Sequence, residues 1–174
     1  MPHTLPHWFL LGAGNMGSLA AWYLTRAGHR ITVIRDATAS PLKKTLWLPD
    51  GQPQAFSLPV LAPAALPDRI NHLLVAVKTP YTRQAMATVA DRLDNGTRVL
   101  RFQNGIGALD GLLPAGCQLM EAITTSAVKG QHPTHTVVAE NATWVGGSSP
   151  PPDWFATLAK HWPHLHWEDD IRPR

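Results

Sequence analysis

The sequence predicts an α/β fold in which helices cover both faces of a mostly parallel sheet. Short, continuous apolar runs recur along the chain, and such runs are typical of strands that are buried on both faces. Several of them are separated by segments whose apolar residues repeat every three or four positions, as on one side of a helix. This alternation predicts a doubly wound architecture. The 174 residues suffice for one domain, and we expect residues 1–174 to form it.

The chain opens with the pattern of a strand, a helix and a second strand. Residues 8–11 are a continuous apolar run that ends at a glycine, which predicts the first strand. Residues 15–27 place apolar side chains at helical spacing, and Gly28 is a helix stop signal. Residues 30–34 are mostly β-branched and apolar, as in a second strand. Together these elements predict one right-handed parallel crossover.

From residue 37 onward the pattern is irregular at first and then alternates again. Prolines make residues 37–67 an irregular excursion, in which residues 46–61 predict a hairpin that turns at Asp50 and Gly51. The later elements that we predict are a strand over 72–77, a helix from Thr79, a strand over 97–103, a glycine-rich turn and short helix over 104–114, a strand over 117–128, paired strands over 135–147 and a helix from Asp153.

The composition excludes several classes of protein. The chain is 44% hydrophobic and 16% charged, which is too apolar for a disordered protein. Its formal net charge is +3, yet the basic residues are scattered, and the densest pair, Lys43 and Lys44, stands alone. We therefore expect no nucleic acid partner, and an anionic small molecule suits the charge balance better.

Cysteine and histidine usage argue for a reducing compartment and against a metal site. Cys117 is the only cysteine, which excludes an internal disulfide and a cysteine metal cluster, so we expect a cytoplasmic protein. The first apolar run is broken by Gly12 and is too short for a signal segment or membrane span, so no membrane partner is expected. The histidines of residues 132–135 and 161–167 lack a regular ligand face, and we expect them at surface or capping positions.

A glycine motif lies where the first strand turns into the first helix. Gly12 permits the tight turn, Gly14 has no side chain to keep a pyrophosphate from the backbone, and Gly17 allows close packing of helix and strand. The helix amino terminus adds free amide donors. The motif between a strand and a helix predicts a Rossmann-type dinucleotide-binding domain, with phosphate contacts from Gly12, Ala13, Gly14, Asn15, Met16 and Gly17.

The end of the second strand normally selects between the two nicotinamide cofactors. An acidic residue there bonds the ribose 2′-hydroxyl of NAD, whereas an arginine accommodates the 2′-phosphate of NADP. This sequence supplies both, Arg35 and then Asp36. Successive strand residues face opposite sides, so only one of the two points naturally at the ribose. The residues leave both cofactors open, and either charge could also be a solvated strand end.

Four segments together resemble one family, the ketopantoate reductases (2-dehydropantoate 2-reductases). The most specific feature is the combination of Lys78 with the Gln103-Asn104-Gly105-Ile106-Gly107 turn. The resemblance implies an N-terminal domain that binds NADPH and an enzyme that reduces 2-dehydropantoate, a 2-keto acid, to pantoate for pantothenate and coenzyme A synthesis. The segments are residues 12–36, 73–85, 102–112 and 122–147.

The resemblance also implies further site residues. Lys78 and Asn104 match positions that line the family's cofactor and substrate cleft, and Ala127 falls near another cofactor contact. Lys78 and Asn104 also lie just past predicted strands, where parallel sheets form their ligand crevice. From the residues alone, Lys78 could instead be a solvated loop lysine and Asn104 a turn residue before a glycine.

The sequence departs from the family pattern in two places. The family usually has an arginine at the end of the second strand, where this chain has Asp36, with Arg35 one position earlier, so NAD remains possible. The family continues into a helical C-terminal domain with the catalytic lysine, whereas this chain stops at Arg174. We therefore expect no catalytic residue and little turnover from this chain alone.

Two other functions and one surface feature remain open. The chain could be a non-catalytic NAD(P)-binding sensor or regulator, or part of another dehydrogenase, such as an opine or hydroxyacid enzyme. Trp154, Trp162 and Trp167 are expected to pack the last helix on the sheet. Alternatively, they form an exposed patch that binds a partner or a second copy, giving a homodimer.

Overall fold

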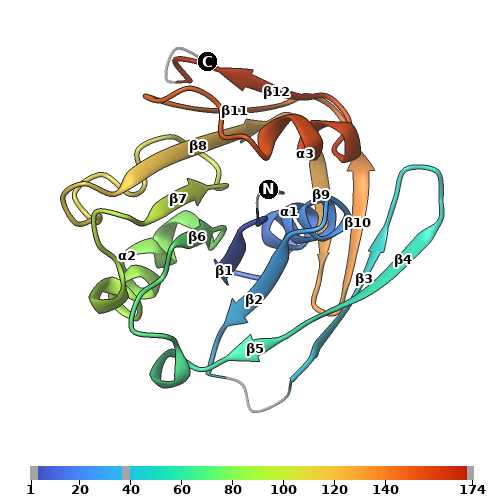
Figure 1. The fold of residues 1–174 in the computed structure, drawn as a ribbon. Helices are drawn as coiled ribbons and strands as arrows, with labels where there is room; N and C mark the ends of the chain where they lie inside the picture. The colour runs from blue at the N-terminus through green and yellow to red at the C-terminus, as the bar shows by residue number, and fades with distance from the viewer. Residues whose placement is uncertain (1–3, 37–39, 172–174) are drawn as a thin grey trace.

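The computed structural model describes residues 4–36 and 40–171, and it contains two sheets with α1 between them (Figure 1). The larger sheet has eight strands in the order β12-β11-β8-β7-β6-β1-β2-β5. Its six strands from β8 to β5 run parallel, and β11 joins them antiparallel to β8. Its strands are β1 (His7–Leu11), β2 (Arg30–Ile34), β5 (Val60–Leu61), β6 (His72–Val75), β7 (Arg98–Arg101), β8 (Gln118–Thr124), β11 (Thr143–Gly147) and β12 (Leu165–Glu168). The predicted mostly parallel α/β fold is confirmed.

The opening crossover from β1 through α1 to β2 is also confirmed. Helix α1 (Asn15–Arg26) follows the glycine turn, and residues Gly17 to Leu24 are buried without interruption. A helix that rests on one sheet alone leaves a polar side exposed, so burial of this extent requires cover from a second direction. The cover comes from a smaller sheet on the far side of α1 (Figure 1).

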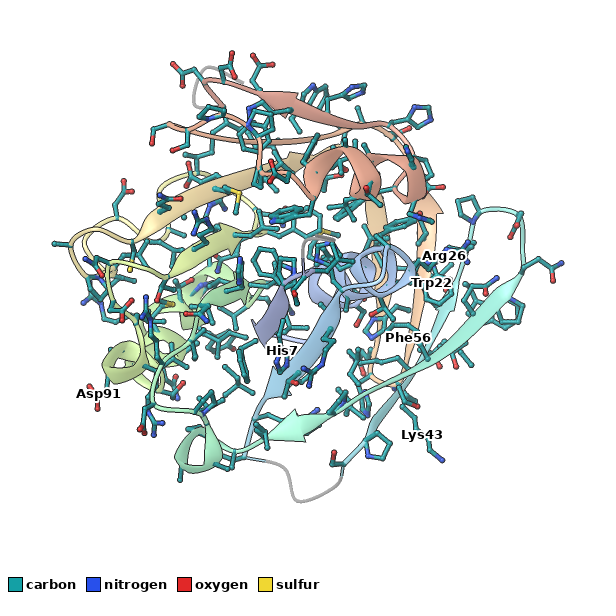
Figure 2. All side chains as sticks on the ribbon, in the orientation of Figure 1. His7, Trp22, Arg26, Lys43, Phe56 and Asp91 are labelled. Carbon is teal, nitrogen blue, oxygen red and sulfur yellow. The ribbon has the colours of Figure 1, made fainter. Side chains whose placement is uncertain are left out.

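The smaller sheet has the order β4-β3-β10-β9. Strands β3 (Leu42–Trp47) and β4 (Pro53–Leu58) form a hairpin around the predicted Asp50-Gly51 turn. The hairpin packs on α1 through Phe56, which contacts Trp22 at 5.5 Å between ring centroids, and the guanidinium of Arg26 lies over the same Trp22 ring (Figure 2). The excursion after β2 is therefore a structural layer that covers α1.

Two predictions about the later strands are wrong. Residues 117–128 are not one strand, because β8 ends at Thr124 and β9 (Ala127–Gln131) turns away into the smaller sheet. Residues 135–147 are not paired with one another. Strand β10 (Thr134–Ala139) pairs with β9 and β3, whereas β11 pairs with β8 and β12. The chain thus changes sheets twice between β8 and β11.

The opposite face of the larger sheet is covered by short helices and turns. The helix predicted from Thr79 is divided into a 3₁₀ turn (Thr79–Tyr81), α2 (Thr82–Ala87) and a second 3₁₀ turn (Ala90–Arg92). The short helix predicted over 104–114 is wrong: these residues, all described, form turns. Their glycines at 105, 107 and 111 have positive φ angles, which a right-handed helix does not accept.

The last helix, α3 (Phe155–His161), packs beside α1, and the tryptophans around it pack in or against the core. Trp162 stacks on Tyr23 with 5.0 Å between ring centroids, Trp154 meets Trp8 edge-on, and Trp167 meets Phe155. These tryptophans are buried or half-buried, so the alternative of an exposed tryptophan patch is wrong. No helix within residues 4–36 and 40–171 is long and apolar enough to cross a membrane.

Candidate dinucleotide site

The glycine turn lies at the carboxyl end of β1, beside the point where the strand order of the larger sheet reverses. From β1 the chain proceeds to β2 on one side, and β6 lies on the other. Ligands of open α/β sheets bind in the crevice at such a reversal. The turn after β1 and the loop after β6, which carries Lys78, therefore face the same crevice.

Gly12 and Gly17 are required by the backbone of this turn. Gly12 has φ +95°, and a Cβ there would collide with the backbone of Val77. A Cβ at Gly17 would collide with the carbonyl oxygen of Gly12 and press on Ala76. Gly12 thus permits the turn, and Gly17 permits close packing of α1, as the sequence predicts; Gly12 also allows the loop after β6 to approach.

Gly14 differs because it faces open space. A Cβ added there meets no described atom within 4 Å. Gly14 is the N-cap of α1, no described side chain caps this helix end, and the first helical turn carries no acidic residue. The free N–H groups and the positive end of the helix dipole are therefore available to an anion.

A cavity of about 680 Å³ opens above the turn. Six of the predicted site residues line it, and a second cavity of about 430 Å³ continues from it past Met16 and Asn104 toward Thr124. The six are Gly12, Gly14, Asn15, Met16, Lys78 and Asn104, and they are joined by residues that sequence reasoning missed, among them Tyr81, Phe102, Gln103 and Val128.

The other predicted site residues lie outside the cavity wall. Ala13 and Gly17 belong to the turn but do not line the cavity. Ala127 is exposed at the start of β9, and its neighbour Val128 is the one that lines the cavity. Arg35 is exposed just past the end of β2.

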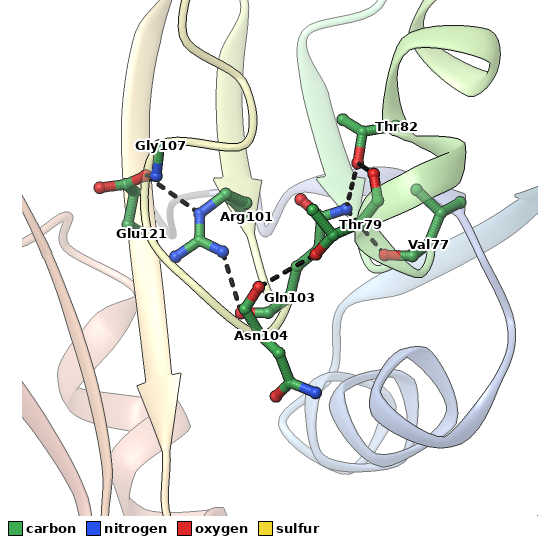
Figure 3. A network of polar contacts seen from close by, with 8 residues as sticks. All are labelled: Val77, Thr79, Thr82, Arg101, Gln103, Asn104, Gly107 and Glu121. Carbon is green, nitrogen blue, oxygen red and sulfur yellow. Dashed lines mark hydrogen bonds and ion pairs between the residues drawn. The ribbon is translucent and has the colours of Figure 1, made fainter.

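A network of hydrogen bonds holds the two loops of the crevice together (Figure 3). The Gln103 carboxamide nitrogen donates to the Val77 carbonyl oxygen at 2.7 Å and to Thr82 Oγ1 at 2.8 Å. Thr79 Oγ1 donates to the carbonyl oxygen of Asn104 at 3.0 Å. These bonds fix the backbone on both sides of Lys78 relative to Asn104. Gln103 Oε1 is buried and has no hydrogen-bond partner among the described residues.

Lys44 and His135 are two site residues that the sequence analysis missed. Lys44 is only 2% exposed, and its Nζ donates to the carbonyl oxygen of Ala13 at 2.6 Å. His135 is 1% exposed, so the expectation of a surface or capping position is wrong for this residue. Burial, and then the positive charge of Arg35, lowers the pKa of Lys44 to about 8. Burial and Lys44 lower the pKa of His135 to about 4.

A cavity of about 660 Å³ at the opposite edge of the sheet has none of these features. It lies where β6 and β7 begin and is lined by His72, Arg98 and Trp154 among others. The glycine turn does not reach it. In the described part of the chain, no group of three or more metal-ligating side chains is found at either place.

The described residues fit a dinucleotide. The open space above Gly14 admits a phosphate, the uncapped start of α1 supplies donors, and the joined cavities extend on to Asn104. Together the strand order and the glycine turn define an α/β domain of the Rossmann type.

Comparison with known proteins specifies this class further. Residues 8–150 match the family described as ketopantoate reductase PanE/ApbA, and the chain belongs to this family. The 2-dehydropantoate 2-reductase of Pyrococcus abyssi is 28% identical over 130 residues, which are 72% of this chain and 42% of that protein. The resemblance seen in the sequence is confirmed.

Solved structures share the fold. The dimeric ketopantoate reductase of Staphylococcus aureus superposes with a TM-score of 0.73 at 15% identity, over 97% of this chain and 62% of that one. A family member from Ralstonia eutropha gives 0.74 at 21% identity, over 96% and 58%. D-mandelate dehydrogenase, solved with NADH and anilino(oxo)acetate, gives 0.72 at 16% identity, over 96% and 58%. The chain thus spans about half the length of these relatives.

Proposed function

We propose that this chain binds NADPH and is the single dinucleotide-binding domain of an oxidoreductase that reduces a 2-keto acid, namely 2-dehydropantoate to pantoate. The observation that carries the proposal is the open helix amino terminus at Gly14, above which a cavity leads on to Lys78 and Asn104. The family supplies the substrate class. Family membership and the free thiol of Cys117 suit a reducing cytoplasm.

The charges near the end of β2 favour NADPH over NADH. Arg35 lies close enough to Lys44 and His132 for its positive charge to lower the pKa of both side chains. The positive charges of Arg35 and Lys44 at this position suit the 2′-phosphate, which the ribose of NADH lacks. Asp36 is exposed beside Arg35, so a carboxylate for the NADH ribose is also at hand.

The cavity residues have distinct roles in the proposed reaction. When bound, NADPH supplies a hydride to the keto carbon, and a proton must then reach the keto oxygen. The ammonium of Lys78 attracts the substrate carboxylate or a cofactor phosphate, and the Asn104 carboxamide donates to a carbonyl. Lys78 and Tyr81 are the ionisable side chains among the described residues of the two cavity walls.

We further propose that efficient turnover needs a second domain and that the assembly is dimeric. Hydride transfer requires the keto acid to be fixed and a proton to be delivered to it. The family relatives are longer than this chain, and one of them is a dimer. A helical domain from a family member is the natural complement for testing this.

Titration of the chain with NADPH and with NADH, followed by tryptophan fluorescence, tests which cofactor it binds more tightly. We expect tighter binding of NADPH, and we expect Arg35→Gln to remove the difference while Asp36→Asn leaves it. Gly14→Asp is the non-binding control, because its carboxylate occupies the phosphate position. Tighter binding of NADH would overturn the NADPH assignment, and absence of binding to a folded chain would overturn the dinucleotide site.

Turnover is tested separately. NADPH oxidation with 2-dehydropantoate is followed for the chain alone and for a mixture with a helical domain from a family member. We expect activity in the mixture only. If cofactor binds but the mixture oxidises no NADPH with this or other 2-keto acids, the reductase assignment is wrong and a binding module remains.

A further inference from the structure

Three side chains from three different elements form a chain of hydrogen bonds beneath the glycine turn. Lys44 comes from β3, His135 from the neighbouring β10, and Asn15 is the first residue of α1. Lys44 Nζ lies 2.9 Å from His135 Nε2, and His135 Nδ1 lies 2.7 Å from Asn15 Oδ1. The smaller sheet therefore reaches the phosphate-binding end of α1 through polar side chains.

The direction of these hydrogen bonds follows from the chemistry of lysine. A charged lysine has three donors and no acceptor, so His135 Nε2 must accept. A neutral imidazole with an accepting Nε2 carries its proton on Nδ1. The low pKa of His135, about 4, keeps the ring neutral at pH 7. His135 Nδ1–H then donates to Asn15 Oδ1.

This direction determines how the Asn15 carboxamide is turned. Its oxygen is engaged by His135, so its NH₂ group is on the opposite side. Asn15 lines the cavity above Gly14, and no described residue accepts a hydrogen bond from its NH₂ group. The NH₂ group is thus a spare donor next to the backbone amides that face the phosphate site.

We propose that Lys44 is a positioning residue: through His135 it holds the Asn15 carboxamide with its NH₂ group toward the pyrophosphate of a bound dinucleotide. The inference rests on the proposed function, since it needs a dinucleotide in the cavity. It adds the smaller sheet to the binding machinery and assigns roles to two buried residues that are not themselves in the cavity wall.

The arrangement makes binding depend on pH. Among the described residues, Arg35 acts on the charge of Lys44, and His132 and His135 respond to it; none of these three is an acid. Burial and Arg35 lower the pKa of Lys44 to about 8. A neutral amine can accept as well as donate, so above this pH His135 is free to take the other tautomer and to release Asn15.

ADP-ribose is the probe for the first experiment, because it carries the pyrophosphate without the nicotinamide or the 2′-phosphate. Its affinity is measured by calorimetry from pH 6.5 to 9.5. We expect the affinity of the unaltered chain to fall about tenfold around pH 8, as for loss of one hydrogen bond to a charged group. Lys44→Met should bind weakly at every pH, and Lys44→Arg, which stays charged, should keep its affinity across the range.

Two controls separate positioning from general damage. Lys43→Met alters the adjacent lysine, which is exposed on the outer side of β3, and should leave the pH profile unchanged (Figure 2). Asn15→Ala should remove the pH dependence, and adding Lys44→Met to it should cost nothing more. A flat profile for the unaltered chain, or full additivity of the two substitutions, overturns the inference. Failure of the unaltered chain to bind either ADP-ribose or NADPH overturns the proposed function itself.

A second measurement does not depend on variants of Lys44. Long-range ¹H–¹⁵N spectra of the histidine rings at pH 7 report the tautomer of His135, whose signals are identified by their loss in His135→Gln. We expect the Nδ1–H tautomer at pH 7 and a change of its signals around pH 8. An Nε2–H tautomer at pH 7 would show that Lys44 does not set the direction of the hydrogen bonds.

Discussion

Arg101 and Glu121 face each other as register partners on the parallel strands β7 and β8 and form a buried ion pair (Figure 3). Arg101 Nε lies 3.0 Å from Glu121 Oε1, and the two side chains are 0% and 4% exposed. Arg101 Nη1 also donates to the Gln103 carbonyl oxygen, and the Gly107 N–H donates to Glu121. The pair therefore holds both ends of the turn that carries Asn104.

Removal of one partner of this pair should lower the free energy of unfolding more than removal of both partners. Glu121→Leu leaves the Arg101 charge buried, and we expect it to lower the free energy of unfolding by about 3–5 kcal/mol. The double variant Arg101→Leu/Glu121→Leu leaves no buried charge and should be more stable than either single variant. Urea unfolding of the three variants measures the coupling, and simple additivity would contradict this account.

The glycine turn predicts opposite effects for two neighbouring glycines. Gly14→Ala adds a methyl group where the structure leaves space, so we expect the melting temperature to stay near that of the unaltered chain while NADPH affinity falls at least tenfold. Gly17→Ala forces a collision with the Gly12 carbonyl oxygen and should lower the melting temperature by several degrees or prevent folding. Thermal unfolding with and without NADPH compares the two. A destabilised Gly14→Ala chain would contradict the open space above Gly14.

Buried histidines predict sensitivity to acid. His29 is 4% exposed, accepts a hydrogen bond from Trp8 Nε1, and has a pKa lowered to about 4 by burial and then by His72. The unfolded state binds protons near pH 6.5, before the folded state does, so the stabilising contribution is complete above pH 6.5 and is lost as the pH falls toward 4.

The variant His29→Gln tests this contribution, since glutamine can accept from Trp8 without titrating. For His29 the loss is at most about 3 kcal/mol. As the pH falls from 6.5 to 4, the unaltered chain should therefore lose more unfolding free energy than His29→Gln does, so any advantage of the unaltered chain shrinks or reverses. Parallel curves would mean that His29 does not titrate with unfolding.

The local elements and the glycine turn could be predicted from the sequence because their signals are local. The apolar run before Gly12, the helical spacing after Gly14 and the Asp50-Gly51 turn each lie within a short window. The assignment of β10 and β11 to different sheets could not be predicted, because it depends on pairing with strands far away along the chain. No local pattern distinguishes two strands that pair from two that only follow one another.

Lys44 and His135, which the sequence analysis missed, leave only a weak signal in the sequence, namely their positions in alternating strand patterns. In β3 the buried residues Leu42, Lys44 and Leu46 alternate with residues that are exposed or half-buried, so the strand pattern places Lys44 on the buried side. A lysine is rarely buried, and a solvated charge is the ordinary expectation for a Lys-Lys pair. In β10, His135 and Val137 are likewise the buried residues of an alternating pattern. What the sequence could not supply is the meeting of these two strands beneath Asn15.

Lys44 predicts a rise in stability on the alkaline side. Its pKa is about 8 in the folded chain and 10.5 in the unfolded one, so between these values the unfolded state holds the proton that the folded state has lost. Stability therefore increases with pH across this window, and below pH 8 the buried charge is a cost in full. The total is on the order of 3 kcal/mol. Lys44→Met lacks this titration. We therefore expect the unfolding free energy of the unaltered chain, relative to that of the variant, to increase from pH 8 to pH 10. Urea unfolding of both chains at pH 8 and pH 10 measures this increase. If the difference in unfolding free energy between the two chains is the same at both pH values, Lys44 keeps its charge in the folded chain.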